Sequence, residues 1–184
     1  MLARTRLPDA LIQSFNDYAD AHADPARSTG FRLSQEVIHA GGDAALAQQV
    51  TQLIAPIWRA WKARWWRQAI EVVCEVVWMV GQYADTPSPV HFHPTDLSGV
   101  LYLMVPEIDA RQEDKSDISR RQAGYINFTI GGKQRYAKSV ISFKPQVGDF
   151  SIFPGWLPHV AEPFAGSGER RSLSLNATVR TPAD

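Results

Sequence analysis

From residue 69 onward, short apolar segments alternate with turn residues, and this pattern limits the possible folds more than any other feature. The segment AIEVVCEVVWMV at 69–80 is rich in β-branched residues and has the two-residue alternation of a strand. The predicted strands are 69–80, 98–105, 124–130, 136–143, 148–153 and 170–179. Because no helical pattern separates them, we expect antiparallel pairing in a sandwich, jelly roll or barrel.

The first third of the chain has helical periodicity instead. In residues 8–22, Leu11, Phe15 and Tyr18 follow the i, i+4, i+7 spacing of one helix face. Residues 24–42 contain Pro25, Gly30 and a Gly-Gly pair, which predict a loop with at most a short extended piece.

A second helix is predicted after Asp43, with an apolar stripe that runs from Leu46 to Trp65. Pro56 interrupts this stripe, so we expect either a kinked helix or two helices that meet there. The sequence thus predicts one domain over 1–184, in which a helical part at 1–68 packs on the outside of a β core at 69–180.

The composition excludes several classes of function. Lys and Arg together number 19, as do Asp and Glu, so no net field favours nucleic acid or an anionic membrane. The single cysteine, Cys74, excludes an internal disulfide and a Cys-rich zinc site, and it fits a reducing compartment. No apolar run approaches the roughly 20 residues of a membrane span, and the N-terminus lacks a signal-peptide pattern. We therefore expect a cytoplasmic protein without nucleic-acid or membrane partners.

Two histidines lie one residue apart in the segment PVHFHPTDLSGVLYL at 89–103. In an extended chain His91 and His93 point to the same side, as a metal site or a proton-transfer site requires. A third histidine, His159, follows a Pro-Gly-Trp-Leu-Pro loop further along the chain. Imidazoles bind iron, copper, nickel or zinc, so the three histidines are candidate metal ligands.

The segment RRSLSLN predicts a receptor for an anion. By strand parity, one face carries a cation, two hydroxyls and an amide, from Arg170, Ser172, Ser174 and Asn176. Such groups are costly to bury without a partner, and a bound carboxylate would satisfy them. Arg171 shares its side with leucines, and we expect it to reach solvent at the strand end.

In their order and spacing, HFHPTDLSGVLYL, GDFSIFPGWLPHVAEP and RRSLSLN resemble a family of 2-oxoglutarate- and Fe(II)-dependent oxygenases. The resemblance covers about residues 78–179. It implies a double-stranded β-helix, which is a cupin-like jelly roll, with the metal at one open end. It also implies that His91 and His159 are iron ligands and that Arg170 and Ser172 bind the distal carboxylate of 2-oxoglutarate. The expected reaction hydroxylates a substrate with O2 and releases succinate and CO2.

The third iron ligand has two candidates, because the wider superfamily has a carboxylate at the position of His93. We expect His93 to bind, with Asp96, the nearest acid downstream, as the alternative. Tyr102 is a further candidate for binding 2-oxoglutarate. The other possible pocket residues are Tyr125, Asn127, Trp156 and Asn176.

Two other functions fit part of this pattern. A three-histidine cupin enzyme that uses no oxoacid would explain the histidines but not Arg170 and Ser172. A non-catalytic jelly-roll binding module would hold a metal only for structure. The sequence leaves the substrate open between a small molecule and a peptide. An exposed strand edge would also allow a homodimer, and the polar segment 106–122 is either a solvated loop or a lid.

Overall fold

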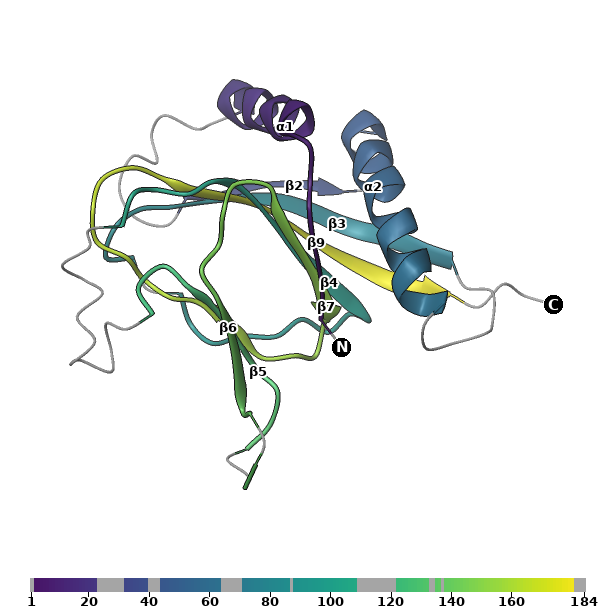
Figure 1. The fold of residues 1–184 in the computed structure, drawn as a ribbon. Coiled ribbons are helices and arrows are strands. Elements are labelled where there is room, and N and C mark those ends of the chain that lie inside the picture. The colour runs from purple at the N-terminus through teal and green to yellow at the C-terminus, as the bar shows by residue number, and fades with distance from the viewer. Residues whose placement is uncertain are drawn as a thin grey trace.

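The protein is described here by a computed structural model (Figure 1). The described residues are 2–22, 32–39, 44–63, 71–86, 88–108, 122–132, 135–136 and 138–180. The elements, in chain order, are β1 (Ala3–Arg6), α1 (Asp9–His22), β2 (Arg32–His39), α2 (Ala44–Ala63), β3 (Glu71–Gln82), β4 (Leu97–Met104), β5 (Ile126–Thr129), β6 (Val140–Phe143), β7 (Asp149–Pro154), β8 (His159–Ala161) and β9 (Arg170–Arg180).

The strands form two antiparallel sheets, as the sequence predicted. The larger sheet has the order β1-β7-β4-β9-β3-β2, and the smaller sheet has the order β6-β5-β8. Figure 1 shows the smaller sheet on one side of the larger sheet and both helices on the other. This is a jelly-roll arrangement, one of the three architectures expected from the run of strands and the one that the family resemblance implies.

The helices are held on the larger sheet by an apolar core. Ile12 and Phe15 of α1 and Val50 of α2 are buried against sheet residues such as Leu173 and Leu175. Leu11 and Tyr18, which flank Phe15 on the predicted helix face, are partly buried against the same core. The helical spacing of apolar residues in α1 therefore matches the face that packs on the sheet.

A second apolar cluster joins the two sheets. Its buried members are Tyr102 of β4, Ile126 and Phe128 of β5, Phe153 of β7, and Leu157. The Phe128 and Phe153 rings meet edge to face, with centroids 4.8 Å apart. Three of these residues, Tyr102, Ile126 and Phe153, also line a pocket between the sheets.

The part predicted to be helical, 1–68, also contains two strands. β1 pairs with β7 and β2 pairs with β3, so both extend the larger sheet at its edges. Local pattern did not reveal β1, because ARTR has no apolar alternation and only its pairing with β7 makes it a strand. The predicted loop at 24–42 contains β2, and the rest of that segment lies outside the described residues.

Helix α2 continues through Pro56 as one helix, so of the two alternatives the structure has the single helix. The predicted cap at Asp43 lies outside the described residues. The predicted strand at 136–143 is shorter, since β6 begins at Val140. Of the polar segment 106–122, residues 109–121 lie outside the described residues. Among the helices that the structure describes, none has the length and apolar character needed to cross a membrane.

Candidate metal centre and anion-binding pocket

Backbone hydrogen bonds bring the three histidines together. His91 lies in the extended segment before β4, and His159 begins β8. The His91 N–H donates to the His159 carbonyl at 3.0 Å, and the His159 N–H donates to the His91 carbonyl at 2.9 Å. The His93 N–H donates to the Gly155 carbonyl at 2.8 Å. In such an antiparallel pair the opposed side chains share a face, so His91 and His159 lie on the same side.

Gly155 allows this close approach. A Cβ at this position would lie 2.1 Å from the Thr95 carbonyl oxygen and 2.9 Å from that of His93. No side chain fits there, because both contacts are with backbone atoms. The Pro-Gly-Trp-Leu-Pro loop therefore holds the His93 segment against the turn that leads to His159.

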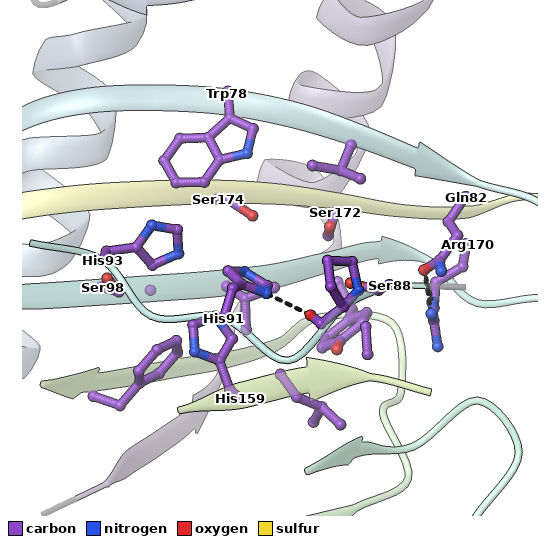
Figure 2. A pocket seen from close by; sticks show the side chains of 18 residues that line it. Trp78, Gln82, Ser88, His91, His93, Ser98, His159, Arg170, Ser172 and Ser174 are labelled. Atoms are coloured by element: carbon purple, nitrogen blue, oxygen red, sulfur yellow. Dashed lines mark hydrogen bonds between the residues drawn. The ribbon is translucent and has the colours of Figure 1, made fainter. Parts of the chain in front are cut away.

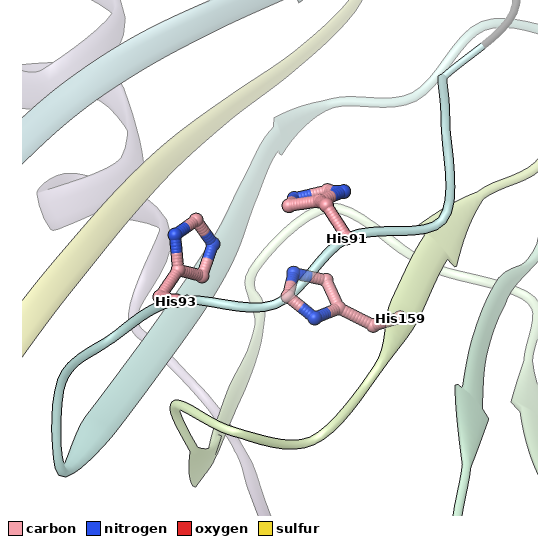
Figure 3. A group of neighbouring side chains, drawn as sticks. All are labelled: His91, His93 and His159. Carbon is pink, nitrogen blue, oxygen red and sulfur yellow. The ribbon is translucent and has the colours of Figure 1, made fainter.

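The three imidazoles converge, as Figure 3 shows. Ring centroids are 4.3 Å apart for His91 and His159, 5.1 Å for His91 and His93, and 5.3 Å for His93 and His159. One ligand atom from each ring lies within 4.8 Å of the others. Nitrogen ligands about 2.1 Å from a shared ion are at most about 4.2 Å apart. Small side-chain rotations would therefore bring these nitrogens to metal-binding distance.

Hydrogen bonds fix the tautomer of two of these rings. His91 Nδ1 lies 2.9 Å from the Pro89 carbonyl, and His159 Nδ1 lies 2.9 Å from the Leu157 carbonyl. A carbonyl can only accept, so each Nδ1 carries the hydrogen and each Nε2 keeps its lone pair. Metal-binding histidines are oriented by the same kind of bond.

Burial also favours the neutral imidazole. It lowers the pKa of His159 to about 4, because the charged ring would lose its solvation. It lowers the pKa of His93 as well, with a smaller contribution from the charge of His91. At physiological pH His93 and His159 therefore present lone pairs rather than protons, and the three converging imidazoles together fit a divalent transition metal.

The histidines open into a pocket of about 450 Å³ between the two sheets (Figure 2). Among the described residues that line it, Arg170 is the one side chain with a permanent charge, and none is a carboxylate. The lining residues are Trp78, Val80, Gln82, Ser88, Pro89, His91, His93, Ser98, Gly99, Val100, Tyr102, Ile126, Phe153, His159, Ala161, Arg170, Ser172 and Ser174. Figure 2 shows Arg170 and Gln82 at one end and the histidines at the other.

Strand register arranges the inner face of the larger sheet in rows across β3, β9 and β4. Gln82 pairs with Arg170 at one end of this face. The next row is Val80, Ser172 and Tyr102, and the row after it is Trp78, Ser174 and Val100. The predicted parity of β9 is thus confirmed, because Arg170, Ser172 and Ser174 line the pocket while Leu173 and Leu175 are buried in the core under the helices.

Arg170 is buried with neutral partners. Its side chain, 3% exposed, donates from Nη1 to the carbonyls of Gly124 at 3.1 Å and Glu162 at 2.9 Å. Nε and Nη2 both donate to Gln82 Oε1, with the Nε bond at 3.1 Å. Phe164 lies beneath the guanidinium, with its ring centroid 5.3 Å from Cζ. Burial lowers the pKa of Arg170, which reflects the cost of keeping this charge away from water.

Two hydroxyls lie in the row next to Arg170. Tyr102 is 3% exposed, and burial raises the pKa of its phenol to about 12, so the group remains a hydrogen-bond donor at neutral pH. Ser172 faces the pocket from β9, directly opposite Tyr102 in the register. A cation and two hydroxyl donors at one end of a pocket can bind a carboxylate.

The structure keeps Asp96 away from the histidines. Its carboxylate accepts a hydrogen bond from the Val179 N–H at 2.8 Å and is exposed. It belongs neither to the histidine cluster nor to the pocket lining among the described residues. The chain bends at residues 94–96 before β4, and there the Asp96 carboxylate meets the backbone of β9 at Val179.

Four other predicted pocket residues do not line the pocket. Asn176 accepts a hydrogen bond from Ser98 Oγ at 2.8 Å. Trp156 is 59% exposed at the loop surface. Tyr125 and Asn127 fall on the other side of the smaller sheet, because it is Ile126, between them, that faces the pocket.

Arg171 also differs from the prediction, since it does not reach solvent. It is 9% exposed and binds Glu169 of its own chain segment and Asp20 of α1, with the Asp20 contact at 2.8 Å. Its prediction failed because the position of α1 over this strand end is not visible in the local sequence.

Sequence reasoning missed Gln82 and gave no role to Trp78, although both line the pocket. The predicted strand ended at Val80, two residues before Gln82. Extending the alternation across Gly81 would have placed Gln82 on the same face as Trp78. The Trp78 ring contacts the His93 ring edge to face, with centroids 5.6 Å apart.

A family model described as "Putative 2OG-Fe(II) oxygenase" matches residues 76–176, which is more than half of the chain and includes every pocket residue named above. The chain belongs to this oxygenase family. The oxygenase therefore depends on Fe(II) and 2-oxoglutarate, and it requires O2 and an organic substrate. Family membership disfavours an enzyme without an oxoacid and a non-catalytic module. A search of curated proteins finds no match for this sequence.

Solved structures support the fold of the oxygenase. A prolyl-4-hydroxylase from Pseudomonas putida is 16% identical, with a TM-score of 0.59, 96% of this chain covered and 91% of that one. A viral collagen prolyl hydroxylase from Paramecium bursaria Chlorella virus-1, in complex with 2-oxoglutarate, is 13% identical, with a TM-score of 0.60 and coverage of 99% and 96%. HygX from Streptomyces hygroscopicus, with nickel, 2-oxoglutarate and hygromycin B bound, is 9% identical, with a TM-score of 0.60 and coverage of 96% and 82%.

Proposed function

We propose that this oxygenase hydroxylates an organic substrate while 2-oxoglutarate is oxidised to succinate and CO2, with iron held by His91, His93 and His159. The observation that carries the proposal is the presence, in one pocket, of three convergent imidazoles and a buried arginine that forms no ion pair among the described residues. The reaction balances as substrate C–H, O2 and 2-oxoglutarate giving substrate C–OH, succinate and CO2.

When bound, Fe(II) would supply the activation of O2 that this chemistry requires. The protein supplies orientation. The carbonyls of Pro89 and Leu157 bind Nδ1 of His91 and His159, which leaves Nε2 of each ring to bind the metal. The buried side chains around the histidines, such as Phe153, limit the access of water.

At the other end of the pocket, Arg170 would bind the distal carboxylate of 2-oxoglutarate. Tyr102 and Ser172 lie in the adjacent row and would donate from their hydroxyls to the same carboxylate. This would direct the oxoacid end of the molecule toward the histidines.

We include His93 rather than Asp96 as the third ligand. The support is geometric, because His93 is in the cluster and Asp96 is engaged by the Val179 N–H at the surface. Three neutral ligands leave the metal complex more positive by one charge than two histidines and a carboxylate would. An anionic cosubstrate would offset part of that charge.

We propose that the substrate is a small molecule or a peptide side chain. The structural neighbours include prolyl hydroxylases and a protein with hygromycin B bound, which together span both classes. Trp78, Val100 and Ser174 form the row between the cosubstrate end and the histidines, so these side chains are candidates to contact the substrate. A cytoplasmic location and a homodimer remain predictions.

The deciding experiment measures succinate formed from 2-oxoglutarate by anaerobically purified protein after addition of Fe(II) and O2. We expect the wild type to form succinate, and His159→Ala to reduce it to the level without enzyme. Trp156→Ala is the matched control, because Trp156 lies in the same loop but outside the pocket lining. Tight iron binding with no succinate would contradict the proposal and favour a three-histidine enzyme that uses no oxoacid.

A further inference from the structure

Gln82 is the residue most closely associated with Arg170. It is 3% exposed and lies directly opposite Arg170 in the pairing of β3 with β9. Its Oε1 accepts from both Nε and Nη2 of the guanidinium. Its own Nε2 donates to the Thr86 carbonyl at 2.7 Å. Because that carbonyl can only accept, the amide is held with its oxygen toward Arg170.

Four of the five hydrogen-bond donors of the Arg170 guanidinium have acceptors among the described residues. Arginine has five N–H donors. The carbonyls of Gly124 and Glu162 take both donors of Nη1, while Gln82 takes the Nε donor and one donor of Nη2. One Nη2 donor remains without a partner among the described residues. The guanidinium is therefore fixed in orientation on most of its edge and keeps one donor available.

All of these acceptors are neutral. None of the ion pairs among the described residues involves Arg170, whereas Arg171 beside it binds the carboxylates of Glu169 and Asp20. A glutamate at position 82 would have nearly the same shape as glutamine but would neutralise the guanidinium. The amide thus orients the cation without cancelling its charge.

We propose that Gln82 is a positioning residue that holds Arg170 in place through a neutral amide, so that the guanidinium can form its ion pair with the distal carboxylate of 2-oxoglutarate. This inference rests on the proposed function, because it assigns a partner to the arginine that binds the cosubstrate. Gln82 acts through Arg170 and by itself contacts no reacting atom. It sets cosubstrate affinity, and the turnover of bound cosubstrate does not depend on it.

The test is Gln82→Glu, assayed for 2-oxoglutarate binding by anaerobic calorimetry with Fe(II), for succinate kinetics and for thermal stability. We expect Kd and KM for 2-oxoglutarate to rise about 30-fold, because the new carboxylate takes the place of the ligand's charge. We expect kcat to stay within about threefold and Tm to change little, because the counterion gained by the buried cation is offset by the lost hydrogen bond to the Thr86 carbonyl. A mutation that only damaged the structure would lower Tm and kcat together.

Two further variants complete the experiment. Gln82→Met removes the acceptor at similar size, and we expect a lower Tm and a Kd raised about fivefold. Gln146→Glu is the matched control, because Gln146 accepts from Arg6 Nη1 at 3.2 Å at an exposed site outside the pocket. We expect that variant to bind 2-oxoglutarate like the wild type.

The outcomes separate this inference from the proposed function. Unchanged Kd in Gln82→Glu would overturn the inference, as would a parallel loss of kcat and Tm. A wild type that binds 2-oxoglutarate but forms no succinate would overturn the proposed reaction and leave the role of Gln82 to be decided by the binding data. A wild type that binds no 2-oxoglutarate would overturn both.

Discussion

Arg170 and Arg171 are neighbours on β9, and both are buried, yet they lie in opposite electrostatic environments. Arg171 faces helix α1 and binds the carboxylates of Glu169 and Asp20. Arg170 faces the pocket and has only neutral acceptors. Hydrogen bonds and the charges of Glu169 and Asp20 outweigh burial and raise the pKa of Arg171, whereas burial lowers that of Arg170.

We interpret the difference as a division of roles, in which Arg171 stabilises the fold and Arg170 binds a ligand. Burying a cation is costly unless a counterion compensates it. The helix side of β9 supplies that counterion from the protein. On the pocket side, Arg170 forms no ion pair among the described residues, and burial lowers its pKa although electrostatic interactions with Tyr102 and Glu162 act to raise it. A bound carboxylate would supply the missing ion pair.

The largest effect on activity should come from replacing Arg170 with alanine, with Arg171→Ala as the comparison. Loss of a buried ion pair costs about 4 kcal/mol, so Arg170→Ala should lower kcat/KM for 2-oxoglutarate about 1,000-fold. Arg171→Ala should leave kcat/KM within about threefold while lowering the free energy of unfolding by about 2 kcal/mol. Succinate assays and denaturant unfolding measure the two effects. Equal losses of activity in both variants would contradict the assignment of Arg170 to ligand binding and of Arg171 to the fold.

The second prediction compares His93, in the pocket, with Asp96, at the surface, as the third iron ligand. His93→Ala should weaken iron binding at least about 100-fold, because the cluster loses one of three ligands. Asp96→Asn should leave iron affinity within about twofold, since Asp96 is engaged by a backbone N–H outside the cluster. Anaerobic Fe(II) titration measures both affinities. A greater loss in Asp96→Asn would make Asp96 the third ligand.

The third prediction concerns how well α1 and α2 shield one face of the larger sheet from solvent, with Cys74 as the probe. Burial raises the pKa of Cys74 from 9.0 to about 11, and the thiol is 6% exposed. The thiolate is the reactive form, so at pH 8 a shift of this size lowers its fraction about 100-fold. We expect thiol reagents to modify the native protein at least that much more slowly than the unfolded chain. The rate should increase as pH rises toward 11. Rapid labelling at pH 8 would show that the helices do not keep the thiol reagent away from this face of the sheet.

The contrast between the two faces also explains what the sequence could reveal. Alternation within β9 predicted that Arg170 and Ser172 share the pocket face, because strand parity is a local property. The contacts of Arg171 and Asp96 depend on partners far along the chain, namely Asp20 and Val179. Gln82 was missed for the same reason, since its role comes from the pairing of β3 with β9. The meeting of His91 with His159 was expected from the family resemblance, and strand periodicity alone would not have indicated it.

The smallest effect should come from the hydroxyls beside Arg170, and it tests whether the pocket face acts as a single receptor. A hydrogen bond to a charged group contributes about 1.5 kcal/mol, so Ser172→Ala and Tyr102→Phe should each raise KM for 2-oxoglutarate about tenfold. Ser142→Ala is the control, because Ser142 accepts from Gln122 Nε2 at 3.0 Å and lies outside the pocket lining.

The double variant decides how the two hydroxyls act. If both donate to one carboxylate, removing the second hydroxyl should cost a different amount once the first is gone, because the ligand can shift toward the remaining donor. Succinate kinetics on the two single variants and the double variant measure this coupling. Strictly additive losses would mean that Ser172 and Tyr102 contact different parts of the bound molecules. The carboxylate would then be held by Arg170 and one hydroxyl alone, and the other hydroxyl would face the substrate.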